Sequence, residues 1–572
     1  MRIRIIRGVI IFFFVALGLS FFYIQCIQGY HYSELSQKNR IRLVPLLAPR
    51  GNIYDRTGRL LAGSRLAFDC TIIPQEFDVS EKKIRELANL LGMEASSLKR
   101  IITEDAVAPF IPLVLRKDIG KDTAVAISER GVDFPGLVIQ TYPTRYYPNR
   151  GTGSHVLGYL GKISEDELEA LREYGYEPMD LVGRGGLEFF YDDYLKGENG
   201  GMQVEVDARG RELRILGVKE PERGKDIMVS LDLELQRFVD TLMEDSKGAV
   251  MIMLPTTGEM LSLVNKPDFD PNVFISSSRS SGISKLLSRR DYPLVNRSIS
   301  GTYPPGSAFK VVTASAALDL GLLGKDEQLE CKGHYVVGYR RFNCWKRSGH
   351  KMQNIVEGIK NSCNVFFYKT GRRVGVDNLS GYAAQYGFGT RSGIDLPYEA
   401  EGVVPTRSWK QRNIKESWYE GDTLNLAIGQ GYLLVTPIQV LCMINALATE
   451  GQLVRPFLAK EIEGVEVYSD DKKWLNISGD VFRTVKEGTK SAVNGEHGTA
   501  GAARVEGLDV AGKTGTAQAG PEGTHAWFAG YSPFGRPRIS IVIFLEYGGK
   551  GGDRPCKMAA RIFEKLAELD YL

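Results

Sequence analysis

Residues 301–321 read GTYPPGSAFKVVTASAALDLG, and the interpretation of this stretch decides the fold. Two prolines and a glycine at 304–306 interrupt regular structure, and the segment after them is apolar and rich in alanine. This pattern predicts a largely buried helix with Ser307 at its N-terminus, where serine is a common cap. Lys310 follows one turn later among apolar neighbours, and a helix cap alone does not explain a charge at that position.

A buried amine next to a hydroxyl suggests catalysis. Residues three apart share a helix face, so the Lys310 amine can approach the Ser307 hydroxyl. Burial lowers the pKa of a lysine, and a neutral amine can accept the serine proton. The sequence therefore predicts an acyl-transfer nucleophile at Ser307, with helix capping as the alternative. Ser-x-x-Lys alone is weak evidence, because the chain also contains it at Ser80, Ser96, Ser348 and Ser469.

Two later stretches supply groups that such a nucleophile needs. Residues 361–367 read NSCNVFF and place Ser362 and Asn364 after a helix-like segment, whereas residues 511–516 read AGKTGT and place Lys513 in a strand-like segment. Hydroxyls and amines can pass a proton, a cation can hold a carboxylate, and strand N–H groups can stabilise an oxyanion. A second KTG at 369–371 lacks strand context, so we interpret it as the end of a helix.

The N-terminus predicts a membrane anchor. Residues 1–7 carry three arginines, and residues 8–28 are almost entirely apolar, which is the length of about 20 residues that crosses a bilayer. The arginines place residues 1–7 in the cytoplasm and the bulk of the chain on the extracytoplasmic side of a bacterial inner membrane, as a single-pass protein. A cleaved signal peptide is the alternative, but no small-x-small cleavage site follows the apolar run.

The rest of the chain predicts two folded parts, 29–220 and 221–572. At 572 residues the chain exceeds one hydrophobic core, and 72 basic against 69 acidic residues without a long basic run argue against a nucleic-acid partner. Before residue 220 we expect short strands, a turn at Gly58, and a helix starting near Glu165 after a Ser164 cap. After it, a hairpin at 248–267, central helices, strands within 510–547 and a helix at 554–568 predict an α+β domain whose sheet closes from both ends.

The three motifs occur in the order SxxK, SxN and KTG, and this order resembles the penicillin-binding protein and serine β-lactamase superfamily. Stretches such as APRGNIYDRTGRLLA, GRGGLEFFYDDYLKGENG and NRSISGTYPPGSAFK are similar to the class B, monofunctional transpeptidase branch along nearly the whole chain, most of all to its cell-elongation members. The resemblance implies a transpeptidase domain on an elongated, β-rich pedestal of the dimerisation type. It also implies cross-linking of peptidoglycan stem peptides at D-Ala-D-Ala.

The resemblance assigns the catalytic roles residue by residue. Ser307 forms the acyl-enzyme and Lys310 acts as its general base. Ser362 relays protons, and Asn364 hydrogen-bonds the substrate amide. By the same resemblance, β-lactams acylate Ser307, and a polytopic glycosyltransferase of the shape, elongation, division and sporulation family is the partner that polymerises glycan.

The KTG strand receives the substrate-binding roles. The resemblance gives the terminal carboxylate to Lys513 and Thr514. It gives close approach of the substrate strand to Gly515, and contacts that include an oxyanion N–H to Thr516. No cofactor is implied for the acyl transfer itself.

The cysteines predict a metal site. Among seven cysteines, Cys331, Cys344 and Cys363 join His350 in the spacing C-x12-C-x5-H-x12-C, and zinc takes four such ligands in a closed structural site. Cys363 is the middle residue of the SxN motif, so a metal there can fix Ser362 and Asn364, as in the zinc site that this arrangement resembles. The alternatives are a disulfide between Cys331 and Cys344, unpaired structural cysteines, and His334 as a different ligand.

Three other functions remain open at this stage. A D,D-carboxypeptidase shares the same motifs but transfers the acyl group to water. A catalytically silent scaffold for the polymerase need not keep all five motif residues. A β-lactam sensor usually carries several membrane segments or an intracellular effector, and only about seven residues here precede the apolar run.

Overall fold

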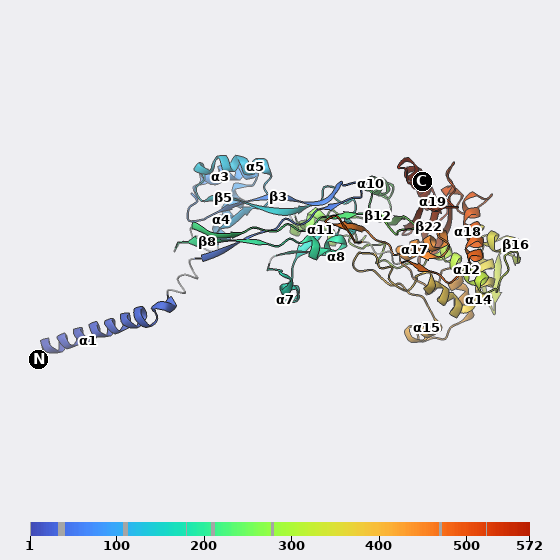
Figure 1. The fold of residues 1–572 in the computed structure, drawn as a ribbon, viewed down its shortest axis with the longest axis horizontal. Coiled ribbons are helices and arrows are strands. Elements are labelled where there is room, and N and C mark those ends of the chain that lie inside the picture. The colour runs from blue at the N-terminus through green and yellow to red at the C-terminus, as the bar shows by residue number, and fades with distance from the viewer. Residues whose placement is uncertain are drawn as a thin grey trace. The chain divides into compact units, whose positions relative to one another are not determined.

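The computed structural model describes residues 2–32, 41–106, 112–178, 180–207, 212–275, 279–467, 472–521 and 523–572 (Figure 1). Contacts divide the chain into two compact units. The first unit consists of Met1–Arg50, Ser64–Thr144 and Lys196–Gly224, and the second of Gly51–Gly63, Arg145–Leu195 and Lys225–Leu572. The chain therefore passes between the units several times, and the domain bounds inferred from the sequence remain a prediction.

The chain begins with a long apolar helix. Helix α1 spans Arg2–Phe22, and a π-helical turn, Tyr23–Ile27, continues it. This is the one helix in the described residues that is long and apolar enough to cross a membrane, and its side chains are exposed along its whole length. The finding supports a single N-terminal membrane anchor.

The first unit is built from two small antiparallel groups of strands. Strands β1 (Ile41–Leu46), β8 (Gly200–Val206) and β9 (Glu212–Lys219) form one sheet. The later part of β3 (Leu60–Ile72) pairs with β4 (Leu113–Arg116) and β5 (Leu137–Tyr146). Three helices share a core with these strands: α3 (Glu81–Leu91), α4 (Ala95–Glu104) and α5 (Lys121–Glu129).

Short elements precede the main domain in the second unit. Gly58, with φ +84°, turns β2 (Ile53–Tyr54) into β3, and Ser164 caps α7 (Glu165–Leu171) in a capping box, so both local predictions are confirmed. Strand β10 (Ile227–Val229) pairs with β2 and β18 (Ala459–Ile462), which pairs with β19 (Val465–Glu466). The other short elements are α6 (Ser154–Leu157), β6 (Leu160–Lys162), β7 (Leu181–Gly183), α8 (Gly186–Phe190) and α9 (Asp192–Leu195).

A five-stranded antiparallel sheet is the centre of the second unit. Its order is β12 (Met260–Lys266), β11 (Gly248–Met253), β23 (Ile539–Leu545), β22 (Thr524–Ser532) and β21 (Ala511–Gln518). The first two strands come from the start of the domain and the last three from its end, so the predicted closure of the sheet is confirmed. Strands β11, β12 and β23 are buried on both faces, and their sequences are correspondingly apolar.

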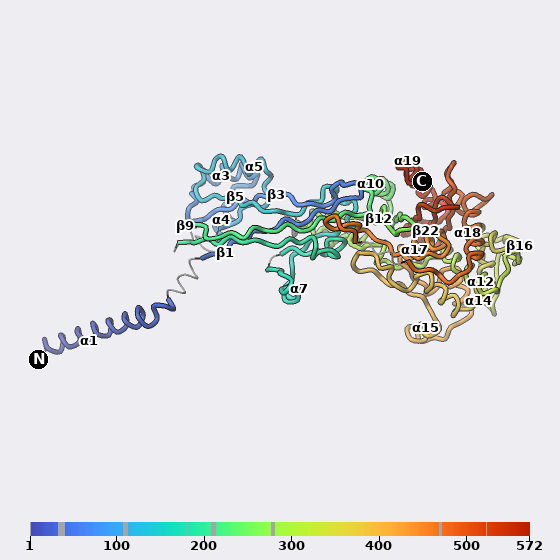
Figure 2. Tube along the Cα trace, in the orientation of Figure 1, coloured from blue at the N-terminus to red at the C-terminus, as the bar shows by residue number. Residues whose placement is uncertain are grey.

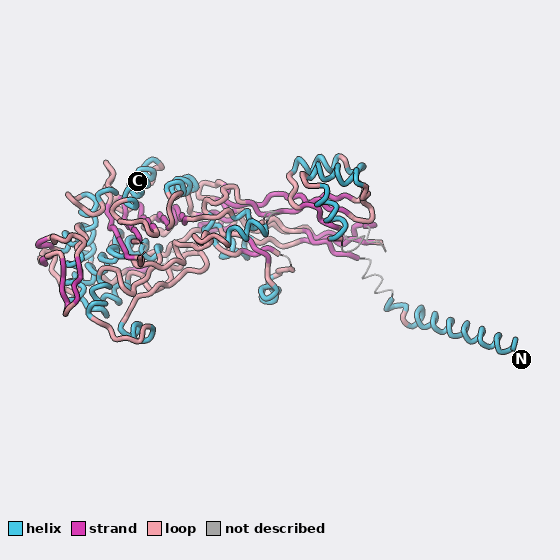
Figure 3. Tube along the Cα trace, turned by 180° about the vertical axis from the view of Figure 1, so that it is seen from behind, coloured by secondary structure: helices cyan, strands magenta, loops and turns pink. Residues whose placement is uncertain are grey.

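Helices pack against both faces of this sheet through two hydrophobic cores. Figure 3 shows helices and strands together in this part of the chain. One core joins the sheet to α10 (Leu233–Leu242) and α19 (Arg554–Glu568). The other core joins it to α12 (Lys310–Asp319), α13 (Ile355–Lys360), α14 (Asn364–Gln385), α16 (Glu420–Ala427), α17 (Pro437–Ala448) and α18 (Gly479–Asn494). The predicted α+β class is therefore confirmed.

The second KTG, at 369–371, lies near the end of a helix, as predicted. The helix that contains it begins at Asn364 and ends before Gly375, whose backbone is non-helical (φ +77°, ψ +161°). Gly375 separates this helix from a second one that continues to Gln385, and the label α14 covers both. The absence of a strand at this KTG agrees with its rejection as a site motif.

Candidate active site

Ser307 lies where a tight turn becomes a helix. The 3-10 turn Gly306–Phe309 leads directly into α12, of which residues 310–317 are all buried. Neither the turn nor α12 has a side-chain cap, and the Ser307 side chain is half-buried. The helix-cap alternative therefore has no support in the described contacts, and the hydroxyl remains available for chemistry.

Close backbone packing holds the turn against the KTG strand. Gly306 has φ +54°, and a Cβ at this position would lie 2.8 Å from the carbonyl oxygen of Thr516 in β21. The Gly306 N–H donates to the Gly429 carbonyl (2.9 Å), and Trp527 Nε1 donates to the Pro304 carbonyl (3.1 Å). Only glycine fits this approach without strain, which explains why Gly306 precedes Ser307.

Lys310 is a fully buried lysine whose described hydrogen bonds all go to neutral acceptors. Its Nζ donates to Asn364 Oδ1 (2.7 Å), to the Ser362 carbonyl (2.8 Å) and to Ser362 Oγ (3.2 Å). Burial lowers the pKa of Lys310 to about 8. These hydrogen bonds join SxxK to SxN, and none of the three reaches Ser307.

Lys513 brings the third motif to the same hydroxyl. Its Nζ donates to Ser362 Oγ and to the Thr514 carbonyl, both at 3.0 Å, and its side chain is fully buried. Burial, and secondarily the charge of Lys310, holds the pKa of Lys513 well below its usual range. Ser362 has φ +48°, a conformation that few non-glycine residues adopt, and its hydroxyl contacts both amines. The structure therefore gathers SxxK, SxN and KTG around Ser362.

The rest of the KTG strand contacts two loops. A Cβ on Gly515 would lie 2.7 Å from the Pro305 carbonyl, so this glycine admits the turn that carries Ser307. Thr514 is buried, whereas Thr516 is exposed and its Oγ1 accepts a hydrogen bond from the Gly551 N–H (3.1 Å). The substrate-binding roles of these residues stay predictions.

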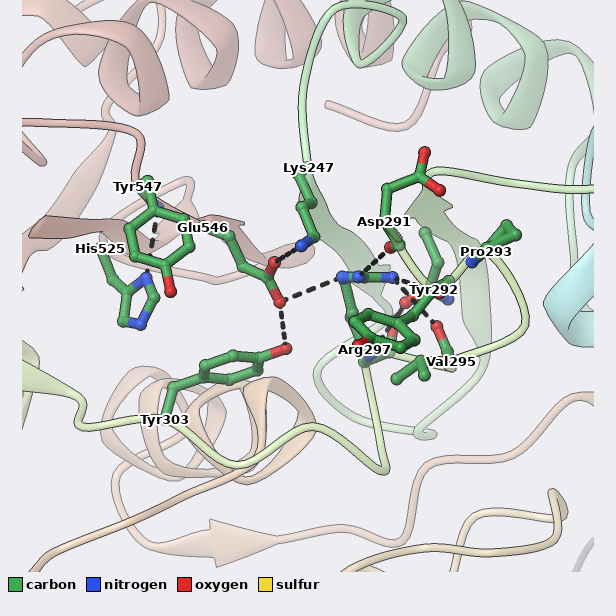
Figure 4. Close-up of polar contacts among 12 residues, drawn as sticks. Lys247, Asp291, Tyr292, Pro293, Val295, Arg297, Tyr303, His525, Glu546 and Tyr547 are labelled. Atoms are coloured by element: carbon green, nitrogen blue, oxygen red, sulfur yellow. Dashed lines mark hydrogen bonds and ion pairs between the residues drawn. The ribbon is translucent and has the colours of Figure 1, made fainter. Parts of the chain in front are cut away.

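A carboxylate that the sequence did not single out, Glu546, anchors Tyr303, which precedes Ser307 in the same stretch (Figure 4). Tyr303 Oη donates to Glu546 Oε1 (2.6 Å), and Arg297 Nε donates to the same oxygen (3.0 Å). Lys247 Nζ lies 3.0 Å from Glu546 Oε2. The Tyr303 backbone pairs with Val435 through two hydrogen bonds, so both ends of this tyrosine are fixed. Tyr303 lies in the quoted stretch, but no local signal marks Glu546, which comes 243 residues later.

The predicted metal ligands converge. One potential ligand atom from each of Cys331, Cys344, His350 and Cys363 lies within 4.8 Å of the others, and the three cysteines are buried. His350 Nδ1 lies 3.5 Å from Cys344 Sγ and 3.7 Å from Cys331 Sγ. A hydrogen bond with the Cys363 thiol lowers the pKa of Cys344 and favours its thiolate.

The structure bears on two alternatives for this cluster, a disulfide between Cys331 and Cys344 and His334 as a different ligand. All the described cysteines are free thiols, so the structure contains no Cys331–Cys344 disulfide in its described part. His334 lies in β14 (His334–Val337) and does not belong to the group of converging side chains. Three sulfur donors and one nitrogen donor in a buried cluster match the preferences of zinc.

Comparison with known families identifies both parts of the chain. Residues 248–568 match the model of the penicillin binding protein transpeptidase domain. Residues 45–229 match the model of the penicillin-binding protein dimerisation domain.

Curated relatives and solved structures agree with these matches. The peptidoglycan D,D-transpeptidases MrdA of Acinetobacter baumannii and of Escherichia coli K12 are each 32% identical, over 98% and 92% of this chain and 87% and 88% of their own lengths. A complex between penicillin-binding protein 2 (PBP2) and MreC from Helicobacter pylori matches with a TM-score of 0.82 and 29% identity, over 93% of this chain and 99% of that chain. A peptidoglycan synthase complex that coordinates polymerization and crosslinking matches with a TM-score of 0.76 and 30% identity, over 98% and 97%.

Proposed function

The chain belongs to the penicillin-binding protein transpeptidases, and we propose that Ser307 is its nucleophile and Lys310 the base that activates it. The protein is a serine-type peptidoglycan D,D-transpeptidase of cell-wall elongation, and the predicted likeness to PBP2 is confirmed. One observation carries the assignment of the base. Lys310 is buried with three neutral acceptors and no carboxylate among its described hydrogen bonds, which favours the neutral amine.

Acyl transfer then proceeds in two steps, acylation of Ser307 and transfer of the acyl group to an acceptor amine. Ser307 Oγ attacks the carbonyl carbon of the penultimate D-Ala while its proton passes to Lys310. The peptide C–N bond breaks, and the terminal D-Ala leaves with a proton on its amine. An amine of a neighbouring stem peptide next attacks the ester carbon, the Ser307 C–O bond breaks, and the proton returns to Ser307 Oγ.

The remaining motif residues serve these two steps. Ser362 Oγ, which contacts both lysine amines, relays the proton to the leaving amine. Asn364 orients the substrate amide. Lys513 and Thr514 bind the terminal carboxylate, Gly515 lets the substrate lie close to the strand, and the Thr516 N–H stabilises the oxyanion.

Mass spectrometry after incubation with benzylpenicillin tests the nucleophile. We expect a single covalent adduct, which peptide mapping places on Ser307. The Ser307→Ala variant is the control, and it should fold normally and carry no adduct. Absence of an adduct in the folded wild-type protein would favour the scaffold function.

The fate of the acyl group separates the transpeptidase from a carboxypeptidase. When lipid II and a glycan polymerase are supplied, a transpeptidase produces cross-linked dimers. A carboxypeptidase instead produces tetrapeptide and free D-Ala in equal amounts. Products of the second kind alone would contradict cross-linking as the activity of this chain.

We also propose that Cys331, Cys344, His350 and Cys363 hold one structural zinc ion. Their three sulfur atoms and one nitrogen atom form a four-donor set with no further side chain in the described group. When bound, the ion would hold β13 (Leu329–Cys331), the following hairpin and the SxN motif together. It would take no part in the acyl transfer. Elemental analysis should find about one zinc per chain. Metal-free, folded protein with a mapped bridge between Cys331 and Cys344 would overturn the site.

The membrane orientation and the polymerase partner complete the proposal. The arginines ahead of the α1 core favour a cytoplasmic N-terminus with the catalytic domain outside the cytoplasm. Similar chains occur in a complex with MreC and in a synthase that couples polymerization with crosslinking. We therefore expect this chain to pair with a polytopic glycosyltransferase of the shape, elongation, division and sporulation family. Protease protection in spheroplasts tests the orientation, and co-purification tests the partner.

A further inference from the structure

One exposed segment concentrates positive charge next to the active site. Residues 332–351, called the basic hairpin here, contain β14, β15 (Arg340–Asn343) and the loop to β16 (Lys351–Gln353). In Figure 2 this part of the chain lies at the edge of the second unit, around the label of β16. The segment has no Asp or Glu, although the whole chain carries a net charge of only +3. Its six cations are all exposed: Lys332, Arg340, Arg341, Lys346, Arg347 and Lys351.

The basic hairpin is tied directly to the SxN motif. Asn364 Nδ2 donates to the Asn343 carbonyl at 3.4 Å, and Trp345 Nε1 donates to the Asn361 carbonyl at 3.0 Å. The ring of Phe342 is buried in the main core and contacts the ring of Tyr368 in α14 (centroids 5.6 Å apart). The cations therefore stand on a scaffold fixed to the residues that receive the substrate.

The charges on this segment have few partners of their own. Within the described residues only Lys332 has an ion pair, an exposed one with Glu330 at 3.4 Å. Arg340 lies over the Phe342 ring, 5.8 Å from its centroid. Tyr339 is fully exposed and Trp345 is 59% exposed, so aromatic surface accompanies the cations. Like charges held together without counter-charges repel each other, and an anionic ligand relieves that repulsion.

We infer that the basic hairpin is a docking surface for acidic peptides, namely the carboxylate-bearing stem peptides of uncross-linked peptidoglycan strands. Every uncross-linked stem that ends in D-Ala carries a terminal carboxylate, so a nascent strand presents a row of negative charges. Binding of that row beside Asn364 raises the local concentration of stems at Ser307. The inference rests on the proposed transpeptidase function and names how that site gathers its polymeric substrate.

The test compares two full-length triple variants with the same change in charge. The first is Arg340→Gln, Lys346→Gln and Arg347→Gln. The control is Lys82→Gln, Arg100→Gln and Lys121→Gln, three exposed cations of the first unit. Each protein is assayed for acylation by benzylpenicillin, for sedimentation with uncross-linked peptidoglycan strands, and for cross-linking of those strands. Strands whose carboxylates have been converted to amides serve as the uncharged probe.

We expect the hairpin variant to bind strands and to cross-link them about fivefold less well at low ionic strength. The loss should shrink in high salt, and amidated strands should bind the wild-type protein as weakly as the variant. Acylation by benzylpenicillin, which is small, should be unchanged in both variants. Normal acylation therefore separates failure of the docking surface from failure of the proposed function.

Two results would overturn the inference. Equal binding and cross-linking by the hairpin variant and the control would show that the charges do not contact the strands. Unchanged strand binding with reduced cross-linking only when the polymerase is present would assign the surface to an acidic protein partner instead.

Discussion

Two buried clusters of the second unit differ in the groups that accept hydrogen bonds from their cationic side chains. Arg145 and Glu188 are almost completely buried and form an ion pair, with Arg145 Nε 2.6 Å from Glu188 Oε1. Tyr147 Oη also donates to this carboxylate (3.1 Å), and Arg145 Nη1 donates to the Gly51 carbonyl (2.5 Å). Lys310 and Lys513 are equally buried, but their described hydrogen bonds go to hydroxyl, amide and carbonyl oxygens.

The difference separates a structural cation from a reactive one. A carboxylate partner keeps a buried cation charged, whereas burial among neutral dipoles favours the uncharged amine. Lys410 follows the first pattern, because it is buried and its Nζ lies 2.7 Å from Asp422. The pKa of Lys410 is accordingly raised, although burial opposes this, whereas the pKa of Lys310 is lowered. The identity of the partner, rather than burial alone, distinguishes the active-site lysines.

The largest expected effect comes from removing the proposed base. Lys310→Met should reduce the rate of acylation by benzylpenicillin about 10³-fold, because no amine then accepts the Ser307 proton. The free energy of unfolding of this variant should stay within about 1 kcal/mol of wild type. The substitution loses the hydrogen bonds of the amine, but it also removes the cost of burying that amine. Stopped-flow acylation and urea unfolding measure the two quantities. A severe loss of stability would place Lys310 with the structural cations.

The next effect concerns stability alone. Arg145→Met should lower the free energy of unfolding by about 3–5 kcal/mol, because it leaves the buried Glu188 carboxylate without its arginine counter-charge. Adding Glu188→Met should restore most of that loss, and protein folded at low temperature should still be acylated. Urea unfolding of the single and double variants checks this. If Arg145→Met left the free energy of unfolding unchanged but slowed acylation, Arg145 would not be a structural cation, and the contrast with Lys310 would be wrong.

The smallest effect sharpens the role of Glu546. Tyr303→Phe removes one hydroxyl from a hydrogen bond to Glu546 and keeps the ring, so acylation should slow by about fivefold. Glu546→Gln should have a similar effect, and the double variant should be no slower than the slower single variant, because both changes act on one contact. Additive effects in the acylation rates would show that Tyr303 and Glu546 act separately.

Local patterns were sufficient to predict many elements of the fold. The Ser164 cap, the turn at Gly58, the strands that close the sheet and the helix Arg554–Glu568 all follow from capping, turn and periodicity rules. The kink within α14 shows the limit of these rules. Gly375 (φ +77°, ψ +161°) is non-helical and separates the two helices of α14. The sequence predicted that a helix ends near residue 371, but not that a second helix follows directly.

The site could be predicted as a set of motifs but not as a network. Spacing selected Ser307, Ser362 and Lys513, but it did not show that both lysine amines meet at the Ser362 hydroxyl. That convergence depends on the left-handed backbone at Ser362 and on strand register. Glu546 was missed for a related reason, because an acidic residue after a strand has no local signature of its contact with Tyr303.

The pH dependence of acylation tests the central claim most directly. Since burial lowers the pKa of Lys310 to about 8, its neutral fraction grows as the pH rises towards and through that value. The charge of Lys310 also lowers the pKa of Lys513, so the titration belongs to the pair. The account predicts that the second-order rate constant for benzylpenicillin rises about tenfold per pH unit below pH 8 and then levels off. A rate constant that stays level from about pH 6 to 9 would contradict Lys310 as the base.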